Sequence, residues 1–159
     1  MESVDDVWDA MTSPERLRRW LQPVTGDLRL GGTFELDSGE HGEILRCEPP
    51  RLLKVSWLYG PDADAWPGTS EVEVRLTSSP TGGAEFELIH AAVVGEPMFP
   101  TYGPGAGGVG WDLYLFGLGR LLAGGGTAAQ VLRTRSDLTS PLRTGQQAGW
   151  FRTWKERAR

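Results

Sequence analysis

The residues of this chain that could do chemistry begin with Gly103, Gly105 and Gly108, which match the pattern G-x-G-x-x-G. Such glycines bind a dinucleotide when they form the turn from a strand into a helix, with an acidic residue about 20 positions later. Here the seven residues before the first glycine include two prolines, and no Asp or Glu occurs from Leu113 to Ser136. We therefore assign the match to a glycine-rich loop and expect no cofactor.

The two histidines and the single cysteine indicate no metal site. His41 stands at an expected turn with Glu40 and Glu43, a grouping more typical of a polar turn than of metal ligands. Cys47 has no partner for an internal disulfide, and its sequence neighbours would not activate a thiol. His90 ends a strand pattern in phase with apolar positions, so it is either a hydrogen-bonded core residue or a polar group facing a pocket.

Motifs of nucleophilic or metal-dependent catalysis are also missing from the sequence. It contains no G-x-S-x-G, no Walker A motif and no H-E-x-x-H. We can pair no nucleophile with a base, so we name no catalytic residue. The sequence favours a binding protein over an enzyme.

The bulk properties predict one cytoplasmic domain. The chain has 159 residues, no apolar run long enough to span a membrane, and an acidic N-terminal segment unlike a signal peptide. A lone cysteine fits a reducing compartment. Residues 1–112 hold 19 acidic and 8 basic side chains, whereas residues 113–159 hold 2 and 8. Because the basic residues are scattered, we expect this segment to face solvent or pack on the acidic body and not to bind nucleic acid.

Hydrophobic periodicity predicts two short helices followed by a five-stranded antiparallel meander. Ser3 and then Ser13-Pro14 are typical helix starts, and Pro23 ends the second helix. Alternating apolar residues then predict strands at 26–36, 41–48, 52–59, 70–77 and 84–90. In the first strand we expect Leu28, Leu30, Phe34 and Leu36 on one face, with a glycine bulge at 31–32. In the second, either Ile44 or the pair Leu45 and Cys47 faces inward.

A long helix is predicted from residue 111 to 123, after a loop at 95–110. Trp111, Leu115, Leu118 and Leu122 form one apolar stripe, and Leu113 and Phe116 lie off it. A helix that is apolar on two sides needs cover on two sides. We expect the sheet to cover one side and a last helix, at about 140–156, to place Trp150 and Trp154 on the other.

Several segments together resemble the activator of heat-shock protein 90 ATPase homologue-like family. They are VWDAMTSPERLRRWL, GDLRLGGTFEL, GEILRCEPPRLLKVSW, the strand that ends at His90, and the helix opened by Gly110-Trp111. The family belongs to the START-like, birch-pollen-allergen-like helix-grip superfamily, and the resemblance covers about residues 4–123. Its matching residues are structural, so no catalytic role is carried over.

The resemblance implies an α+β helix-grip fold, in which a curved antiparallel sheet holds a long helix over an apolar cavity. We expect this domain at 1–126 and a C-terminal extension at 127–159 packed on it. The family has a strand before the first helix that this sequence lacks. Either the true start lies upstream, or the sheet lacks a strand and has an unpaired edge. In the second case we expect a homodimer or a swapped element.

The superfamily binds lipids, sterols, polyketides and other apolar molecules, so we expect a hydrophobic small molecule in a cavity of a few hundred Å³ or more. The eukaryotic namesake uses such a domain to bind the chaperone, so a protein-interaction module is the alternative. An enzyme acting on a lipid- or polyketide-like substrate in the cavity is the third reading. Residues 95–105 are expected as a lid and His90 as the polar anchor. The residues expected to bind the ligand are Trp57, Phe86, His90, Met98, Phe99, Tyr102, Trp111, Tyr114 and Leu115.

Overall fold

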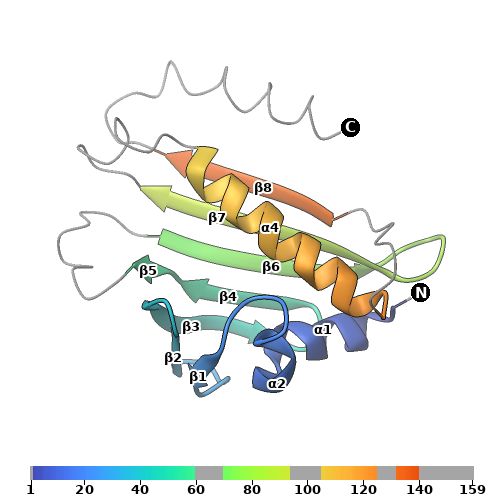
Figure 1. The fold of residues 1–159 in the computed structure, drawn as a ribbon, viewed down its shortest axis with the longest axis horizontal. Helices are drawn as coiled ribbons and strands as arrows, with labels where there is room; N and C mark the ends of the chain where they lie inside the picture. Colours follow the sequence, from blue (N-terminus) through green and yellow to red (C-terminus); the bar gives the residue numbers. More distant parts are fainter. Residues whose placement is uncertain (1, 60–69, 94–104, 125–131, 140–159) are drawn as a thin grey trace.

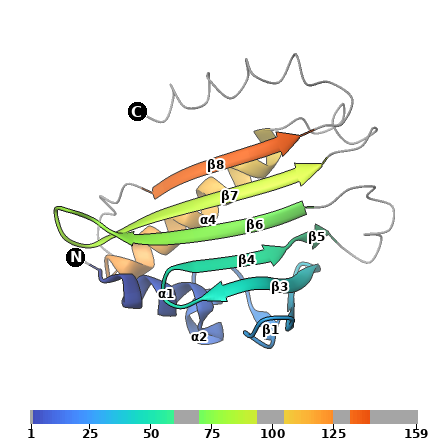
Figure 2. The same cartoon turned by 180° about the vertical axis from the view of Figure 1, so that it is seen from behind.

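The structure is a computed structural model of the chain, and it describes residues 2–59, 70–93, 105–124 and 132–139. One curved sheet is covered on one face by a long helix that crosses it obliquely (Figure 1). Seen from behind, the opposite face of the sheet is not covered by any of the described helices (Figure 2). This arrangement is the expected helix-grip fold.

Two short helices open the chain, as predicted, but the second ends at Leu17 and not at Pro23. In α1 (Val4–Thr12) the Ser3 hydroxyl accepts a hydrogen bond from the Asp6 amide at 3.1 Å, which caps the helix. In α2 (Pro14–Leu17) proline occupies the first turn. Arg16 donates to the carboxylates of Asp6 and Asp9 at 2.8 Å each, and this contact lowers the pKa of Asp6 below its ordinary value. The ion pairs fix the angle between the two helices.

The sheet contains eight strands in the described residues, in the order β1-β2-β3-β4-β6-β7-β8, with β5 paired to β3 outside this path. All pairs are antiparallel except that of β7 with β8. The strands are β1 (Val24–Gly26), β2 (Thr33–Leu36), β3 (Glu40–Glu48), β4 (Leu52–Ser56), β5 (Leu58–Tyr59), β6 (Ser70–Ser78), β7 (Ala84–Val93) and β8 (Leu132–Thr139).

The predicted alternation is confirmed in β6 and β7, the longest antiparallel pair. Val72 and Leu76 of β6 and Phe86 and Leu88 of β7 are buried, and Val72 lies opposite His90 in the register. Their outward neighbours include charged residues such as Glu73. This pair forms the centre of the floor on which α4 (Gly105–Leu122) lies.

The single strand predicted at 26–36 is wrong, because the chain forms two strands that pair with each other. Gly26 (φ 138°) and Gly31 (φ 76°) take backbone conformations that side chains disfavour, and the segment between β1 and β2 leaves the sheet. Leu28 and Leu30 therefore do not share a face with Phe34; they lie in this loop, 45% and 67% exposed.

In β3 both predicted phases are partly realised, because the strand contains a bulge. Ile44 lies opposite Val55, while Arg46 lies opposite Lys54, which leaves Leu45 as the extra residue. Ile44 is buried, Leu45 is exposed, and Cys47 packs against the core again. The strand predicted at 52–59 is likewise interrupted: Trp57 separates β4 from β5 and donates its amide to Ser70 O at 2.7 Å.

The long helix has the predicted buried stripe but begins earlier than expected. It starts at Gly105, so part of the glycine-rich segment predicted as loop is helical. Leu115 and Leu118 are 3% and 0% exposed, whereas Leu113 and Phe116 are 69% and 61% exposed. The helix expected at 140–156, with Trp150 and Trp154, lies outside the described residues. No helix in the described ranges is long and apolar enough to cross a membrane.

A strand in the C-terminal extension was not predicted. β8 pairs in parallel with β7 from Phe86↔Leu132 to Val93↔Thr139, so the sheet is not antiparallel throughout. The segment LRTRSDLT contains only two apolar residues, Leu132 and Leu138, so it lacks the apolar alternation that predicts a strand; it pairs with the backbone edge of β7. This edge is thus paired within the chain, and the expected bare edge is not found there.

A hydrophobic cavity between the sheet, the short helices and the long helix

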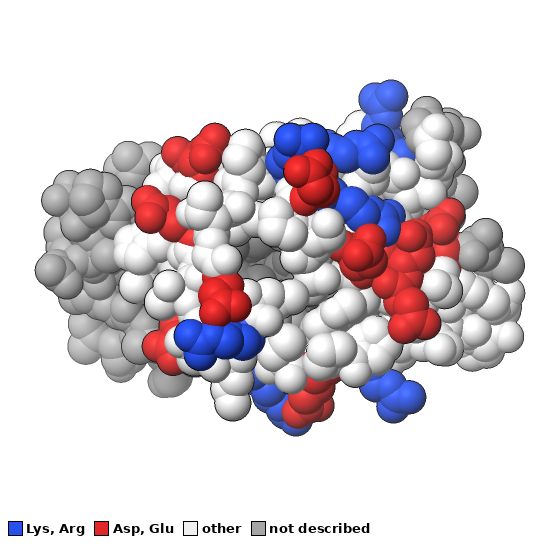
Figure 3. Space-filling view, turned by 90° about the horizontal axis from the view of Figure 1, so that it is seen from below, with Lys and Arg blue, Asp and Glu red and all other residues white. Residues whose placement is uncertain are grey.

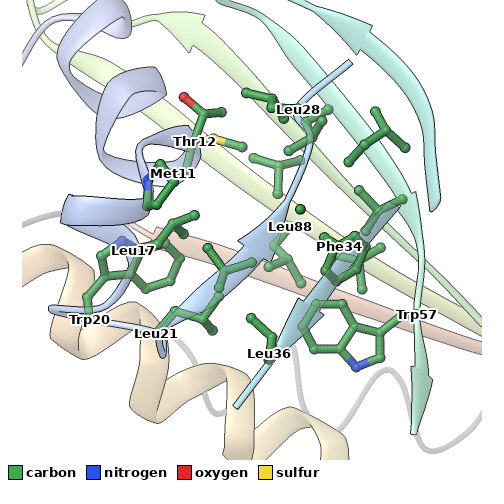
Figure 4. A pocket seen from close by; sticks show the side chains of 18 of the residues that line it. Met11, Thr12, Leu17, Trp20, Leu21, Leu28, Phe34, Leu36, Trp57 and Leu88 are labelled. Atoms are coloured by element: carbon green, nitrogen blue, oxygen red, sulfur yellow. The ribbon is translucent and has the colours of Figure 1, made fainter. Parts of the chain in front are cut away.

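A cavity of about 140 Å³ lies between the sheet and the helices (Figure 4). Its volume is smaller than the expected few hundred Å³ or more. Its described lining comes from α1, α2, α4, β1 to β4, β6 and β7 and the segments that join them. The residues are Met11, Thr12, Pro14, Leu17, Trp20, Leu21, Val24, Thr25, Gly26, Asp27, Leu28, Phe34, Leu36, Ile44, Leu53, Val55, Trp57, Val72, Val74, Phe86, Leu88 and Trp111.

The part of this lining that we call the buried wall is apolar and closely packed. It consists of Trp57, Val72, Val74, Phe86, Leu88 and Trp111, each no more than 8% exposed. Neighbouring aromatic rings contact one another at tilted angles. The ring centroid of Phe34, another residue of the lining, is 5.9 Å from that of Trp57, and the centroids of Trp57 and Trp111 are 5.1 Å apart. Such tilted contacts fix ring orientations as well as burying area.

His90, which does not line the cavity, holds Trp111 in this wall by a hydrogen bond. The Trp111 Nε1–H donates to His90 Nδ1 at 3.0 Å, and His90 Nε2 lies 2.7 Å from the Ser70 hydroxyl. Because Nδ1 accepts, a neutral His90 carries its proton on Nε2 and donates it to Ser70 Oγ. The rings of His90 and Trp111 also meet edge to face, at 6.0 Å and 87°. Both nitrogens of His90 are thus used inside the protein.

Burial keeps His90 uncharged. Removal of the imidazole from water lowers the pKa of His90 from 6.5 to about 4. The two partners, a hydroxyl and an indole N–H, carry no charge that would offset this effect. At neutral pH the residue is a structural hydrogen-bonding group.

The polar atoms of the other tryptophans offer no anchor inside the cavity. The Trp20 Nε1–H donates to the Ala10 carbonyl at 2.8 Å. The Trp57 Nε1 is buried and has no hydrogen-bond partner among the described residues, but it lies on the edge of the indole that points away from Leu88 and Phe34 (Figure 4). A ligand in the cavity therefore meets the carbon faces of these rings.

What we call the mouth consists of the half-buried Thr12 and the exposed Pro14, Thr25, Gly26, Asp27 and Leu28. The first two stand at the junction of α1 and α2, and the others belong to β1 and the loop after it. On this side the molecule has a hollow with acidic side chains on either side, each next to basic side chains (Figure 3). Asp27 forms an ion pair through one carboxylate oxygen, Oδ2, with Arg29 Nε.

The structure brings together three of the nine residues that we expected to bind a ligand. Trp57, Phe86 and Trp111 line the cavity. Three others lie beside it: His90 supports Trp111, Leu115 is in the helix core, and the Tyr114 hydroxyl accepts a hydrogen bond from Gln22 Nε2 at 2.6 Å. Met98, Phe99 and Tyr102, with the lid expected at 95–105, lie outside the described residues.

Sequence reasoning missed the side of the cavity made by α1, α2 and β1. Met11, Leu17 and Trp20 are buried core residues of the helical N-terminal segment, and their side chains also face the cavity. Leu28 was placed in a strand. The available signal was an apolar residue next to glycine and aspartate, which is more typical of a loop than of a strand centre.

The other polar groups considered from the sequence do not form a site. Among the described residues, no three His, Cys, Asp or Glu side chains are placed to hold a metal ion. His41 Nδ1 is 3.1 Å from the Gly39 carbonyl, and Glu40 accepts a hydrogen bond from Ser38. The half-buried Cys47 has a pKa raised by desolvation, which is the opposite of an activated thiol.

Comparison with known proteins identifies the family. The family model described as "Activator of Hsp90 ATPase homolog 1-like protein" matches residues 2–123. The chain belongs to this family. Its fold is a ligand-binding fold, as the resemblance implied. No match was found among curated proteins.

Solved structures of related proteins have the same architecture. The crystal structure of CalU16 from Micromonospora echinospora is 41% identical over 79% of this chain and 71% of that chain, with a TM-score of 0.60. Its solution structure is 36% identical over 99% of this chain and 77% of that one, with a TM-score of 0.63. The Aha1 dimer from Colwellia psychrerythraea is 16% identical over 79% of this chain and 92% of that one, with a TM-score of 0.59, and shows the fold alone.

Proposed function

We propose that this protein binds a hydrophobic small molecule in the cavity between the sheet and its helices. The observation that carries the proposal is the cavity lining, which is apolar except at the mouth and includes the rings of Trp20, Phe34, Trp57, Phe86 and Trp111. Binding sites for small molecules are typically apolar, aromatic-lined and mostly pre-formed. A volume of about 140 Å³ suits a compact ring system or the end of a longer molecule.

A binding role is favoured over catalysis by the chemistry of the lining. Among its described residues, Asp27 is the one ionisable side chain, and it stands exposed at the mouth. His90, the other candidate acid or base, has both nitrogens occupied. General acid–base catalysis requires a titratable group within hydrogen-bond reach of the reacting atoms. The enzyme reading therefore has no support from these side chains.

The test is to measure binding before and after the cavity is filled. Titration of the full-length protein with 2-methylnaphthalene, followed by tryptophan fluorescence, should give saturable binding. Val55→Phe places a ring in the space that Val55 lines and should abolish the signal. Leu45→Phe, on the exposed bulge of β3, is the matched control and should bind normally. Thermal unfolding of both variants verifies that they fold.

Native mass spectrometry of the protein from its own source would complement the titration. A released stoichiometric apolar molecule would identify the natural ligand. Failure of wild type to bind the probe, together with an empty purified protein, would overturn the binding proposal. A protein partner would then become the better hypothesis, and the exposed Leu113 and Phe116 on α4 would be the first surface to mutate.

A homodimer and a cytoplasmic location are further proposals. The bare edge that motivated the dimer is filled by β8 on the β7 side, so pairing of two copies would have to use the outer edge of β8 or of β1. Light scattering of the purified protein tests the dimer, and a mass of one chain would rule it out. Fractionation of cells from the source organism tests the location.

A further inference from the structure

The mouth of the cavity differs in charge from its interior, and this difference bears on what kind of molecule fits. We infer that the ligand has an apolar ring body, which enters the cavity, and a positively charged nitrogen, which stays at the mouth beside Asp27. The inference rests on the proposed binding function and narrows the ligand to one chemical class.

The interior cannot satisfy a polar end of the ligand. The indole N–H groups of Trp20 and Trp111 are already bonded within the protein, and that of Trp57 lies on the edge of its ring away from Leu88 and Phe34 (Figure 4). The rest of the buried wall is aliphatic or phenyl. A polar group without a partner costs free energy when it is buried, so any such group of the ligand must remain at the mouth.

The mouth offers a negative charge to that group. Asp27 is the ionisable side chain of the described lining, and its ion pair with Arg29 uses one carboxylate oxygen, Oδ2. Asp27 and Arg29 are 60% and 69% exposed, so solvent weakens their mutual attraction and Asp27 can accept a second donor.

The end of α1 adds to the negative potential on the opposite side. Thr12, which lines the mouth, is the last residue of this nine-residue helix, and the carbonyl end of a helix carries partial negative charge. The last turn of α1 contains no basic residue to neutralise it. The nearest arginine in the sequence, Arg16, is engaged by Asp6 and Asp9. The carbonyls of Asp9 and Ala10 already accept hydrogen bonds from the Ser13 amide and the Trp20 Nε1–H, so the end of α1 contributes weakly and Asp27 is the main attraction for a cation between α1 and the loop after β1.

Three probes of one shape and different charge test the inference. They are 2-naphthylmethylamine, which is a cation at pH 7, neutral 2-methylnaphthalene, and anionic 2-naphthoate. In the full-length protein we expect the amine to bind more tightly than the neutral probe by a factor of about three, as for an exposed ion pair, and the naphthoate to bind most weakly. Raising the salt concentration should reduce the preference for the amine, because exposed charges are screened.

Two substitutions with opposite expected effects make the test specific. Asp27→Asn should reduce binding of the amine to the level of the neutral probe, which should itself be unchanged. Arg29→Gln frees the second carboxylate oxygen and should tighten binding of the amine about twofold. Glu35→Gln is the matched control: it removes an exposed carboxylate from β2, outside the cavity lining, and should change neither affinity.

The outcomes separate this inference from the proposed function. Equal affinity for the three probes, or the same amine preference in Asp27→Asn, would overturn the inference and leave binding in the cavity intact. Tightest binding of the naphthoate would overturn it as well. Absence of binding for all three probes would overturn the inference and, together with an empty purified protein, the proposed function itself.

Discussion

At the buried wall of the cavity, Trp111 donates a hydrogen bond of 3.0 Å to His90, which is itself bonded to Ser70 at 2.7 Å, whereas at the mouth Leu28 is 45% exposed. The wall combines Trp57, the adjacent strands β6 and β7, and α4, so its residues extend over more than 50 positions of the sequence, whereas the mouth comes from neighbouring segments near the N-terminus. The wall therefore fixes the shape of the cavity and contributes to global stability. The mouth contributes little to stability and is free to select what enters.

The largest difference between the two regions should appear when one leucine is shortened in each. Leu88→Ala removes a side chain that is 1% exposed in the wall, and we expect it to lower the free energy of unfolding by about 3 kcal/mol. Leu28→Ala at the mouth should change it by no more than about 0.5 kcal/mol. Urea denaturation of both variants measures the contrast. Equal losses would show that the mouth is part of the cooperative core.

Acid should weaken the wall through His90. The pKa of His90 is about 4 in the fold and 6.5 in the unfolded chain, so the unfolded chain holds more protons between these pH values. The stabilisation that the fold gains while His90 is neutral is fully present above pH 6.5. It is lost as pH falls toward 4, which lowers the free energy of unfolding by up to about 3 kcal/mol. Denaturation at several pH values, compared between wild type and His90→Gln, isolates the pH dependence of stability that is due to His90. Parallel curves for the two proteins would contradict the prediction.

A smaller effect is expected from the hydrogen bond behind the wall. Ser70→Ala leaves the Nε2–H of His90 buried without its partner, which should cost about 2 kcal/mol of stability. Ser56→Ala is the control: its hydroxyl accepts a bond from the Glu43 amide at 2.8 Å in an exposed setting, and its loss should cost about 0.5 kcal/mol. Thermal unfolding compares the pair, and an unchanged melting temperature in Ser70→Ala would mean that another group or water replaces the hydroxyl.

The smallest expected effect concerns the rates at which a ligand enters and leaves through the mouth. Leu28→Ala should speed both association and release of 2-methylnaphthalene by a factor of about three, which is the order of 0.6 kcal/mol that a partly exposed leucine contributes. Leu30→Ala, two residues away in the same loop but outside the lining, should leave both rates unchanged. Stopped-flow fluorescence measures the rates. A change in both variants would assign the effect to the loop as a whole.

The wall could be predicted from the sequence much better than the mouth. Strict alternation in β6 and β7 and the stripe Trp111, Leu115, Leu118 and Leu122 follow from the period of each element, and they are buried as expected. Period alone does not report where a chain leaves a sheet. Because the backbone turns at Gly26 and Gly31, Leu28 lies in the loop that borders the mouth and not in the predicted strand.

Other parts depend on contacts between distant residues, which a single sequence does not contain. The role of His90 is an example: its phase predicted an inward-facing side chain, but its two partners are 20 and 21 residues away and decide that it supports Trp111 instead of facing the cavity. β8 was missed because its residues were assigned to the C-terminal extension as a whole. Its partner strand, β7, could not be identified from the sequence alone.

The bulge in β3 has a consequence for how this strand can change length. Elsewhere in a strand, removing one residue turns every following side chain to the opposite face. Leu45 is the extra residue between Ile44 and Arg46, so its removal would leave Ile44 and Cys47 on the inner face and Arg46 on the outer one. Deletion of a single residue here therefore does not turn the inner face of the sheet outward. Leu45 marks a place where relatives of different length can share one fold.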